Sequence, residues 1–163
     1  SMPSEYSRKW TDKLPPWLIK LAFFLYPPYL GTGFRLKTFR SDYRLVEVEL
    51  KLRWYNANIF GTHFGGSMYA MIDPFYAVMV WRNLGGEYLV WDHSGAIEYK
   101  KPGRGVLRAR FELNEEALQQ IRDEVARNDR YLFERQIDIF DESGEVIAVA
   151  FKTIFIGKKK SAL

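Results

Sequence analysis

The residues whose types could do chemistry are concentrated between Asn58 and Asp73, where a glycine-rich loop leads into an apolar stretch that continues to about Trp81. Between Gly61 and Trp81, Asp73 is the only side chain that is ionised outright at neutral pH. Burying a carboxylate is unfavourable unless it is paired, hydrogen-bonded or neutralised. Asp73 is therefore either a structural acid satisfied by backbone amides or a strand arginine, or a catalytic base or nucleophile in an apolar groove.

Two glycines supply a second chemical feature. Gly65 and Gly66 stand where the apolar stretch begins, so their N–H groups are among the first-turn donors that lack an intrahelical acceptor. Without a Cβ, they let a ligand approach the backbone closely. Such a helix start can stabilise an oxyanion that develops on a thioester carbonyl in a site that excludes water. We expect these donors and the Asp73 carboxylate within two helical turns of each other.

The apolar stretch that must position these residues has helical spacing. Its apolar side chains recur at intervals of three and four, and the opposite side is hardly more polar. The positions on the first side are Met68, Met71, Ile72, Phe75, Val78 and Met79. A helix that is apolar all round lies inside a domain. We therefore expect one long buried helix, which is kinked at Pro74 because proline removes an intrahelical hydrogen bond.

Alternating and turn patterns predict a sheet that surrounds this helix. The expected strands are 34–40, 44–55, 88–100, 104–113, 131–140 and 145–157. A short apolar helix over 17–26, bounded by proline pairs, precedes them, and Asn114 caps a surface helix inserted between two strands. An antiparallel sheet wrapped around one helix buries that helix economically, so the predicted fold class is α+β.

Length and composition predict one domain, because the 163 residues are 47% hydrophobic and contain no visible repeat or linker. We assign residues 2–31 to an N-terminal extension, 32–158 to the main domain and 159–163 to a basic tail. The absence of cysteine excludes disulfides, thiolate metal sites and a cysteine nucleophile, and it fits a cytoplasmic protein.

Several other kinds of site are not expected. His63 and His93 lack the spacing of metal ligands, and Tyr69 stands where a serine-hydrolase elbow would need its second glycine. Neighbouring Asp92 and Ser94 would alternate faces with His93 on a strand, which is poor geometry for a catalytic relay. The ten-residue apolar helix is too short to span a bilayer.

The net charge of +4 and the pI near 9.2 suit an anionic partner. Coenzyme A is one such partner. The longest basic run contains only three residues, at 158–160, and this argues against nucleic acid.

The loop and helix start carry a family resemblance. The pattern consists of Asn58, Gly61, Phe64, Gly65 and Gly66 at fixed spacing, with Asp73 eight residues after Gly65. It resembles the signature of hotdog-fold acyl-CoA thioesterases over roughly residues 33–157. The Asp73-Pro74 pair and the run from Ala96 to Pro102 are similar to an uncharacterised subgroup, a domain of unknown function. The resemblance implies a hotdog fold, an antiparallel sheet around one long central helix, and a homodimer or homotetramer with shared active sites.

The resemblance also implies hydrolysis of an acyl-CoA thioester, with coenzyme A present only as part of the substrate. Gly65 and Gly66 would polarise the carbonyl, and Asp73 of the partner chain would act as general base on water or as nucleophile. Asn58 would position water or the carbonyl, or would brace the loop through backbone bonds. His63 would shape the pocket, or would orient the carbonyl or water.

Lys100, Lys101 and Arg104, beside a strand turn, are candidates for contact with the phosphates of coenzyme A, although such charges often only face solvent. Two other functions remain open at this point. One is a non-catalytic protein that binds acyl groups or CoA esters in the same groove, and the other is a hydratase that acts on an enoyl thioester.

Overall fold

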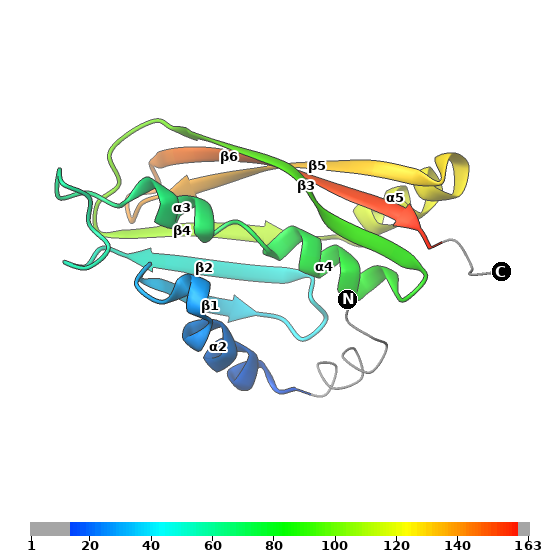
Figure 1. The fold of residues 1–163 in the computed structure, drawn as a ribbon, viewed down its shortest axis with the longest axis horizontal. Helices are drawn as coiled ribbons and strands as arrows, with labels where there is room; N and C mark the ends of the chain where they lie inside the picture. Colours follow the sequence, from blue (N-terminus) through cyan, green and yellow to red (C-terminus); the bar gives the residue numbers. More distant parts are fainter. Residues whose placement is uncertain (1–13, 160–163) are drawn as a thin grey trace.

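The computed structural model describes residues 14–159. The first residues of the expected N-terminal extension, up to residue 13, and residues 160–163 of the expected basic tail lie outside the described residues. One six-stranded antiparallel sheet organises the chain, in the order β1-β2-β4-β5-β6-β3 (Figure 1). Its strands are β1 (Phe34–Phe39), β2 (Leu45–Lys51), β3 (Tyr88–Tyr99), β4 (Val106–Glu112), β5 (Arg130–Phe140) and β6 (Val146–Lys158).

The middle of the sheet follows from the alternation in the sequence. Val48 of β2 and Ala109 of β4 are paired and face the core, together with fully buried neighbours on the same face of each strand. On the outward face, Arg108 Nε lies 2.9 Å from Glu49 Oε1. Apolar positions therefore lie on one face of the sheet and opposite charges pair across strands on the other.

β2 is shorter than its alternating sequence predicts, since it ends at Lys51 and not at residue 55. Buried Asn56 explains the early end. Its Oδ1 accepts the Arg53 N–H at 2.6 Å, and its Nδ2 donates to the carbonyls of Thr32 and Lys51 at 2.7 and 2.8 Å. These bonds fold the chain into a turn, and Trp54 is left 90% exposed.

Two helices, not one long helix, run along the inner face of the sheet. α3 (Gly65–Ala70) and α4 (Phe75–Leu84) are separated by four residues, so the expectation of one long kinked helix is wrong. After Ala70 the hydrogen bonds tighten, because the Asp73 N–H reaches only three residues back, to the Ala70 carbonyl at 3.3 Å. Pro74 then contributes no N–H, and α4 begins directly after it.

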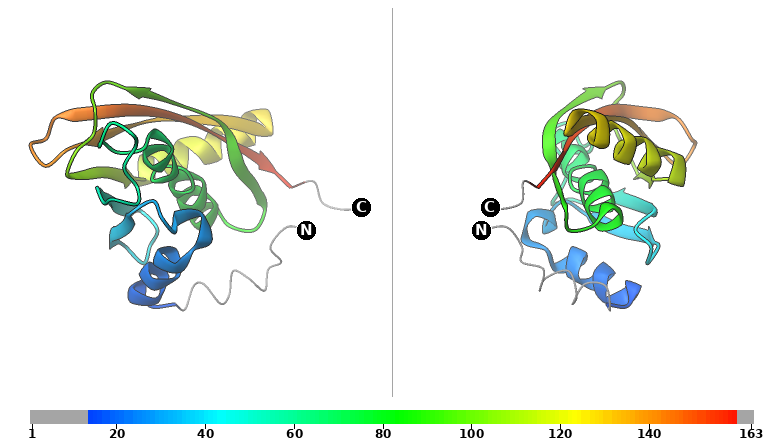
Figure 2. Two further views of the ribbon diagram at one scale, coloured as in Figure 1. Left: turned by 60° about the vertical axis from the view of Figure 1, so that its left-hand side comes forward. Right: turned by 90° about the vertical axis from the view of Figure 1, so that its right-hand side faces the viewer.

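The sheet curves around these two helices (Figure 2). Phe75 and Tyr76, at the start of α4, pack against Phe111 of β4 with ring centroids 5.0 and 5.3 Å apart. The apolar core therefore lies between the inner face of the sheet and the broken helix.

Three further elements lie at the borders of the sheet. α2 (Pro16–Leu25) and the short 3-10 helix η1 (Pro27–Tyr29) lie beside β1. α5 (Glu115–Asn128) is inserted between β4 and β5, as expected, and the Asn114 side chain accepts the Ala117 N–H at 2.8 Å as its cap. α5 packs through a single apolar stripe that includes Leu118 and Val125.

β3 forms one edge of the sheet and contains an extra residue. Its register against β6 shifts at His93, because Asp92 lies opposite Ile154 while Ser94 lies opposite Thr153. Directly opposed residues share a face, so Asp92 points to the inner face with Ile154. Gly95 shares that face, although a regular strand would place residues three apart on opposite faces.

Candidate functional site

Asp73 lies in the irregular segment between α3 and α4. Its side chain is 56% exposed, and its Oδ1 is 3.1 Å from Nζ of Lys152 in β6. The expectation of a carboxylate buried within a helix is therefore wrong, because the helix ends before Asp73 is reached. The carboxylate is open to solvent and is held on one side by the lysine.

Lys152 is the buried member of this group, with a side chain that is only 2% exposed. It lies on the inward face of β6 between apolar positions, and its Nζ also lies 2.9 Å from Oδ1 of Asp92 in β3. A buried ammonium is destabilising unless it is paired. Asp73 and Asp92, both at the solvent border, supply that pairing, so three elements meet at one charged cluster.

The electrostatics of this cluster depend on all three members. Burial disfavours the charged form of Lys152, but the hydrogen bonds and charges of Asp92 and Asp73 outweigh burial and raise the pKa of the ammonium. Burial raises the pKa of Asp92, the charge of Asp73 adds to the rise, and Lys152 opposes it. Burial also raises the pKa of Tyr29, again with a contribution from Asp73, so Tyr29 lies within electrostatic reach of that carboxylate.

Gly65 and Gly66 are the first two residues of α3, as the sequence predicts. A Cβ at Gly65 would lie 2.9 Å from the Tyr99 hydroxyl, which donates to the Gly65 carbonyl, and a Cβ at Gly66 would lie 2.6 Å from the Phe64 ring. A side chain at either position would therefore have to displace an exposed aromatic ring. The N–H groups of both residues belong to the first turn and have no intrahelical acceptor.

Asn58 braces the loop that precedes α3. Its Nδ2 donates to the Thr62 hydroxyl at 2.9 Å and to the His63 carbonyl at 3.2 Å, and its Oδ1 accepts the N–H groups of Phe60 and Thr62. Both ends of the amide thus form hydrogen bonds within the loop. Asn58 therefore braces the loop, which is one of the two roles expected for it from the sequence.

His63 is buried and joins this loop to the turn between β3 and β4. Its backbone N–H donates to the Gly103 carbonyl at 2.9 Å, and its Nε2 lies 2.9 Å from the Gly105 carbonyl. Burial lowers the pKa of His63, and the contact with Gly105 opposes the shift. In the neutral ring, the geometry has Nε2–H donating to Gly105. The Nδ1 atom is buried without a hydrogen-bond partner among residues 14–159.

The basic residues proposed to meet coenzyme A lie at the exposed end of β3 and in the following turn. Lys100 pairs with Glu98, and Lys101 pairs with Glu145. Arg104 reaches back to the carbonyl of Gly61 at 3.5 Å. The structure thus brings Asn58, His63 and Arg104 together around one loop, whereas Asp73 belongs to the cluster with Lys152.

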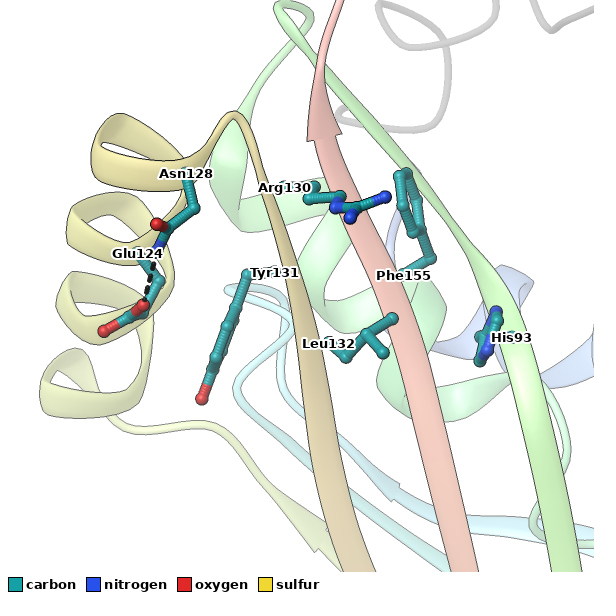
Figure 3. A pocket seen from close by; sticks show the side chains of 7 residues that line it. All are labelled: His93, Glu124, Asn128, Arg130, Tyr131, Leu132 and Phe155. Carbon is teal, nitrogen blue, oxygen red and sulfur yellow. Dashed lines mark hydrogen bonds between the residues drawn. The ribbon is translucent and has the colours of Figure 1, made fainter.

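The surface grooves formed by described residues include three of about 400 to 450 Å³, and Asp73 lines none of these three. One lies where the end of α5 meets the strands, and Figure 3 shows His93 of β3 on its border, apart from Glu124 and Asn128 of α5. A second is lined by Tyr29 and by aromatic side chains of α2 and of the turn after β2. A third lies between α2 and β1.

Sequence reasoning did not identify Lys152 and Asp92 as members of the site. A signal for Lys152 was present, since it is the single charged residue at the inward, alternating positions of an otherwise apolar strand. For Asp92 the sequence suggests only a relay with His93 and Ser94, which strand geometry disfavours. Its inward orientation beside Lys152 depends on the bulge at His93, which the sequence does not reveal.

Solved structures of known proteins resemble the fold of this chain. A protein of unknown function from Pseudomonas aeruginosa, described as a probable thioesterase, superposes with a TM-score of 0.72 at 17% identity and covers 97% of both chains. A thioesterase from Haemophilus influenzae gives 0.61 at 16% identity, over 86% of this chain and 88% of its own. A protein of unknown function from Chlorobaculum tepidum gives 0.66 at 16% identity, over 98% and 99%.

At these identities the likeness shows the fold, and a six-stranded antiparallel sheet curved around helices fits the hotdog fold. No curated protein matches the sequence. One family model does match, over residues 16–156, and it is described as a domain of unknown function. Since this match spans most of the sequence, the chain belongs to the DUF4442 family.

Proposed function

We propose that this protein hydrolyses acyl-CoA thioesters and that Asp73 is its catalytic carboxylate. The observation that carries the proposal is the Asp73 side chain, which is open to solvent and fixed through one oxygen by buried Lys152. A carboxylate oriented in this way keeps its second oxygen for water or substrate. The fold shared with proteins described as thioesterases supports the same chemistry.

In the proposed reaction, the Asp73 carboxylate removes a proton from water, and the water oxygen attacks the carbonyl carbon of the thioester. The N–H groups of Gly65 and Gly66 donate to the oxyanion that forms. When the intermediate collapses, the C–S bond breaks and the sulfur of coenzyme A leaves with a proton. In the alternative route, an Asp73 oxygen attacks the carbonyl carbon, the C–S bond breaks and the thiolate of coenzyme A leaves. Water then hydrolyses the resulting mixed anhydride, which releases the acid and restores the Asp73 carboxylate.

The proposed catalytic unit is a homodimer in which Asp73 and the two glycines of one active site come from different chains. The exposed side chains along β3, at the edge of the sheet, support pairing with a second copy. Lys100, Lys101 and Arg104 are proposed to meet the phosphates of coenzyme A. In that case the surface partners Glu98 and Glu145 would be exchanged for phosphate, which binds lysine and arginine through charge-assisted hydrogen bonds.

Asp73→Asn and Asp92→Asn form a matched pair of variants for testing the proposal, because both carboxylates contact the same ammonium. Thiol release from a panel of acyl-CoA substrates would be measured for each. We expect Asp73→Asn to lower kcat by about 100-fold or more, as removal of a general base does, and Asp92→Asn to leave it within about tenfold. The reverse pattern would assign the base to Asp92.

The same panel separates the other functions. Tight binding of CoA esters without turnover by the wild type would indicate a binding protein. Addition of water across an enoyl-CoA double bond, with the thioester left intact, would indicate a hydratase. Either outcome would refute thioester hydrolysis as the function.

A further inference from the structure

The outward face of α2 is apolar although it lies on the surface. Ile19 and Phe23 face the body of the protein, where the Phe23 ring lies 5.6 Å from that of Phe75. The opposite side presents Trp17, Leu21, Phe24 and Leu25, which are 65%, 44%, 53% and 56% exposed. A helix that is apolar all round is ordinarily covered on both sides. The described residues cover only one side.

The apolar surface continues beyond α2. Phe24 lines two grooves, and one of them extends to Leu30, Trp54 and Tyr55, which are also exposed. The Trp54 side chain is 90% exposed. We call this continuous surface, formed by the outward face of α2 and these three residues, the α2 face. Its tryptophan and tyrosine side chains, Trp17, Trp54 and Tyr55, combine an apolar body with a polar atom, which suits the border between water and an apolar phase.

The charge of the chain is concentrated at the same place. Residues 14–40 contain four basic residues and no acidic one. Because the whole chain has 24 basic and 20 acidic residues, the remainder holds 20 of each and is neutral overall. The complete formal excess of +4 therefore belongs to the segment that forms α2, η1 and β1.

Two of these four cations border the α2 face and have no carboxylate partner in residues 14–159. Lys20 and Arg35 line the groove of about 450 Å³ between α2 and β1, together with Trp17 and Leu21, and Lys20 Nζ donates to a backbone carbonyl at 2.7 Å. The other two, Lys37 and Arg40, pair with Glu49 and Asp42.

We propose that the α2 face docks on the surface of an anionic lipid membrane, with Trp17, Leu21 and Leu25 inserted at the headgroup level and Lys20 and Arg35 against lipid phosphates. An interfacial helix combines these features: an apolar face, flanking cations and interfacial aromatic residues. α2 has ten residues, and no described helix is long and apolar enough to cross a bilayer. The protein therefore lies on the membrane without crossing it through this part of the chain.

A second copy of the chain fits the α2 face less well. A two-fold symmetric contact places the same patch of each protomer against its own equivalent. Such a contact would bring Lys20 and Arg35 of both protomers into one interface, and the segment offers no acidic residue to compensate. Anionic lipid supplies the missing negative charge.

Co-flotation of the full chain with vesicles tests the proposal. The wild type is expected to float with vesicles that contain phosphatidylglycerol, to bind pure phosphatidylcholine vesicles more weakly, and to dissociate as the salt concentration rises. A triple variant combines Trp17→Ser, Leu21→Ser and Leu25→Ser. It should bind both kinds of vesicle more weakly by roughly tenfold or more, since burial of apolar surface is lost. Lys20→Gln with Arg35→Gln should weaken binding only to the anionic vesicles.

A matched control changes Leu132→Ser and Phe151→Ser, which are 45% and 42% exposed on β5 and β6. This variant should float as the wild type does. Circular dichroism checks that each variant is folded, and light scattering measures its mass in solution. Absence of wild-type flotation, or equal flotation of the triple variant and the wild type, would overturn the proposal. A halved mass in the triple variant, without flotation of the wild type, would show that a second copy covers the α2 face.

Discussion

Lys152 places a full positive charge on the inward face of a strand whose other inward positions are apolar. The ammonium is stable there because Asp92 and Asp73 approach it from the border of the core, at 2.9 and 3.1 Å. Both carboxylates keep access to water, so they need little further compensation. The lysine is therefore the member of the cluster whose removal or neutralisation changes the most.

Lys152→Met tests this view through stability. The side chain fits the apolar strand, but Asp73 and Asp92 are left as neighbouring like charges without a cation. We expect the free energy of unfolding at neutral pH to fall by about 1–3 kcal/mol, below the range for fully buried pairs because both carboxylates are partly solvated. Urea denaturation measures the change, and the loss should shrink as acid protonates the carboxylates.

Lys101→Met is the matched control, since Lys101 pairs with Glu145 on the exposed surface. A surface pair contributes at most about 1 kcal/mol, so its loss should change stability little. If Lys152→Met were as stable as the wild type, the buried ammonium would contribute nothing beyond what a methionine supplies.

Asp92 gives a prediction about pH. The pKa of the Asp92 carboxyl is raised in the folded state above its ordinary value of 3.8. In the pH range between 3.8 and the raised pKa, which we call the titration window, the folded protein therefore binds more protons than the unfolded chain. The contribution of Asp92 to stability is therefore present below this window and is lost as pH rises through it. Asp92→Asn removes the titration. Urea midpoints measured from pH 3 to 7 should show the wild type losing stability relative to Asp92→Asn as pH increases, and a constant difference would contradict the shift.

The candidate site was only partly predictable from sequence. Gly65 and Gly66 begin α3, as their position before an apolar helical pattern indicates, because helix starts are encoded locally. The pairing of Asp73 with Lys152 joins residues 79 positions apart, and no local pattern reports such a contact. The sequence leaves two roles open for Asn58. Its hydrogen bonds show that it braces the loop, and a role in positioning water or the carbonyl stays a prediction.

Among the elements, helix ends and hairpins were better predicted than the interruption between α3 and α4. Asn114 caps α5 and Gly85 follows α4 with a φ of 99°, both as expected from residue type. Pro74 was expected only to bend the axis. The helix ends instead, because the hydrogen bonds before Pro74 already span three residues and Pro74 cannot donate one to restore the regular pattern.

Asn56 provides a test of how the ends of two strands are joined. It holds the carbonyls of Thr32, before β1, and Lys51, at the end of β2, through one amide group. Asn56→Ala leaves these carbonyls and the Arg53 N–H without that partner in a buried place. We expect a loss of about 1–3 kcal/mol in the free energy of unfolding, measured by urea denaturation.

Asn128→Ala makes the same chemical change at an exposed position, where the amide donates to Glu124 at 3.1 Å. Surface substitutions of this kind stay within about 0.5 kcal/mol. Similar losses in both variants would mean that the buried hydrogen bonds of Asn56 contribute no more than a surface contact.

For the whole molecule, the open edge at β3 leads to the proposed homodimer. Multi-angle light scattering should give about twice the chain mass of 19.2 kDa. Ser94→Lys with Ala96→Lys adds charge to this edge, and the mass should fall towards that of one chain because like charges on both copies oppose edge pairing. Gln136→Lys is the control. Gln136 is an exposed residue of β5, which is an interior strand of the sheet, so this variant should keep the larger mass. A single-chain mass for the wild type would contradict the dimer.

His93, the extra residue of β3, affects how this chain is aligned with its relatives. Deleting one residue from a strand normally exchanges the two faces for every position beyond it. Here the deletion of His93 would place Asp92 and Ser94 next to each other, opposite Ile154 and Thr153, which are themselves consecutive. A homologue that is one residue shorter at this point would keep its acid on the inner side, and an alignment that puts the gap in a neighbouring loop would misassign that acid by one position.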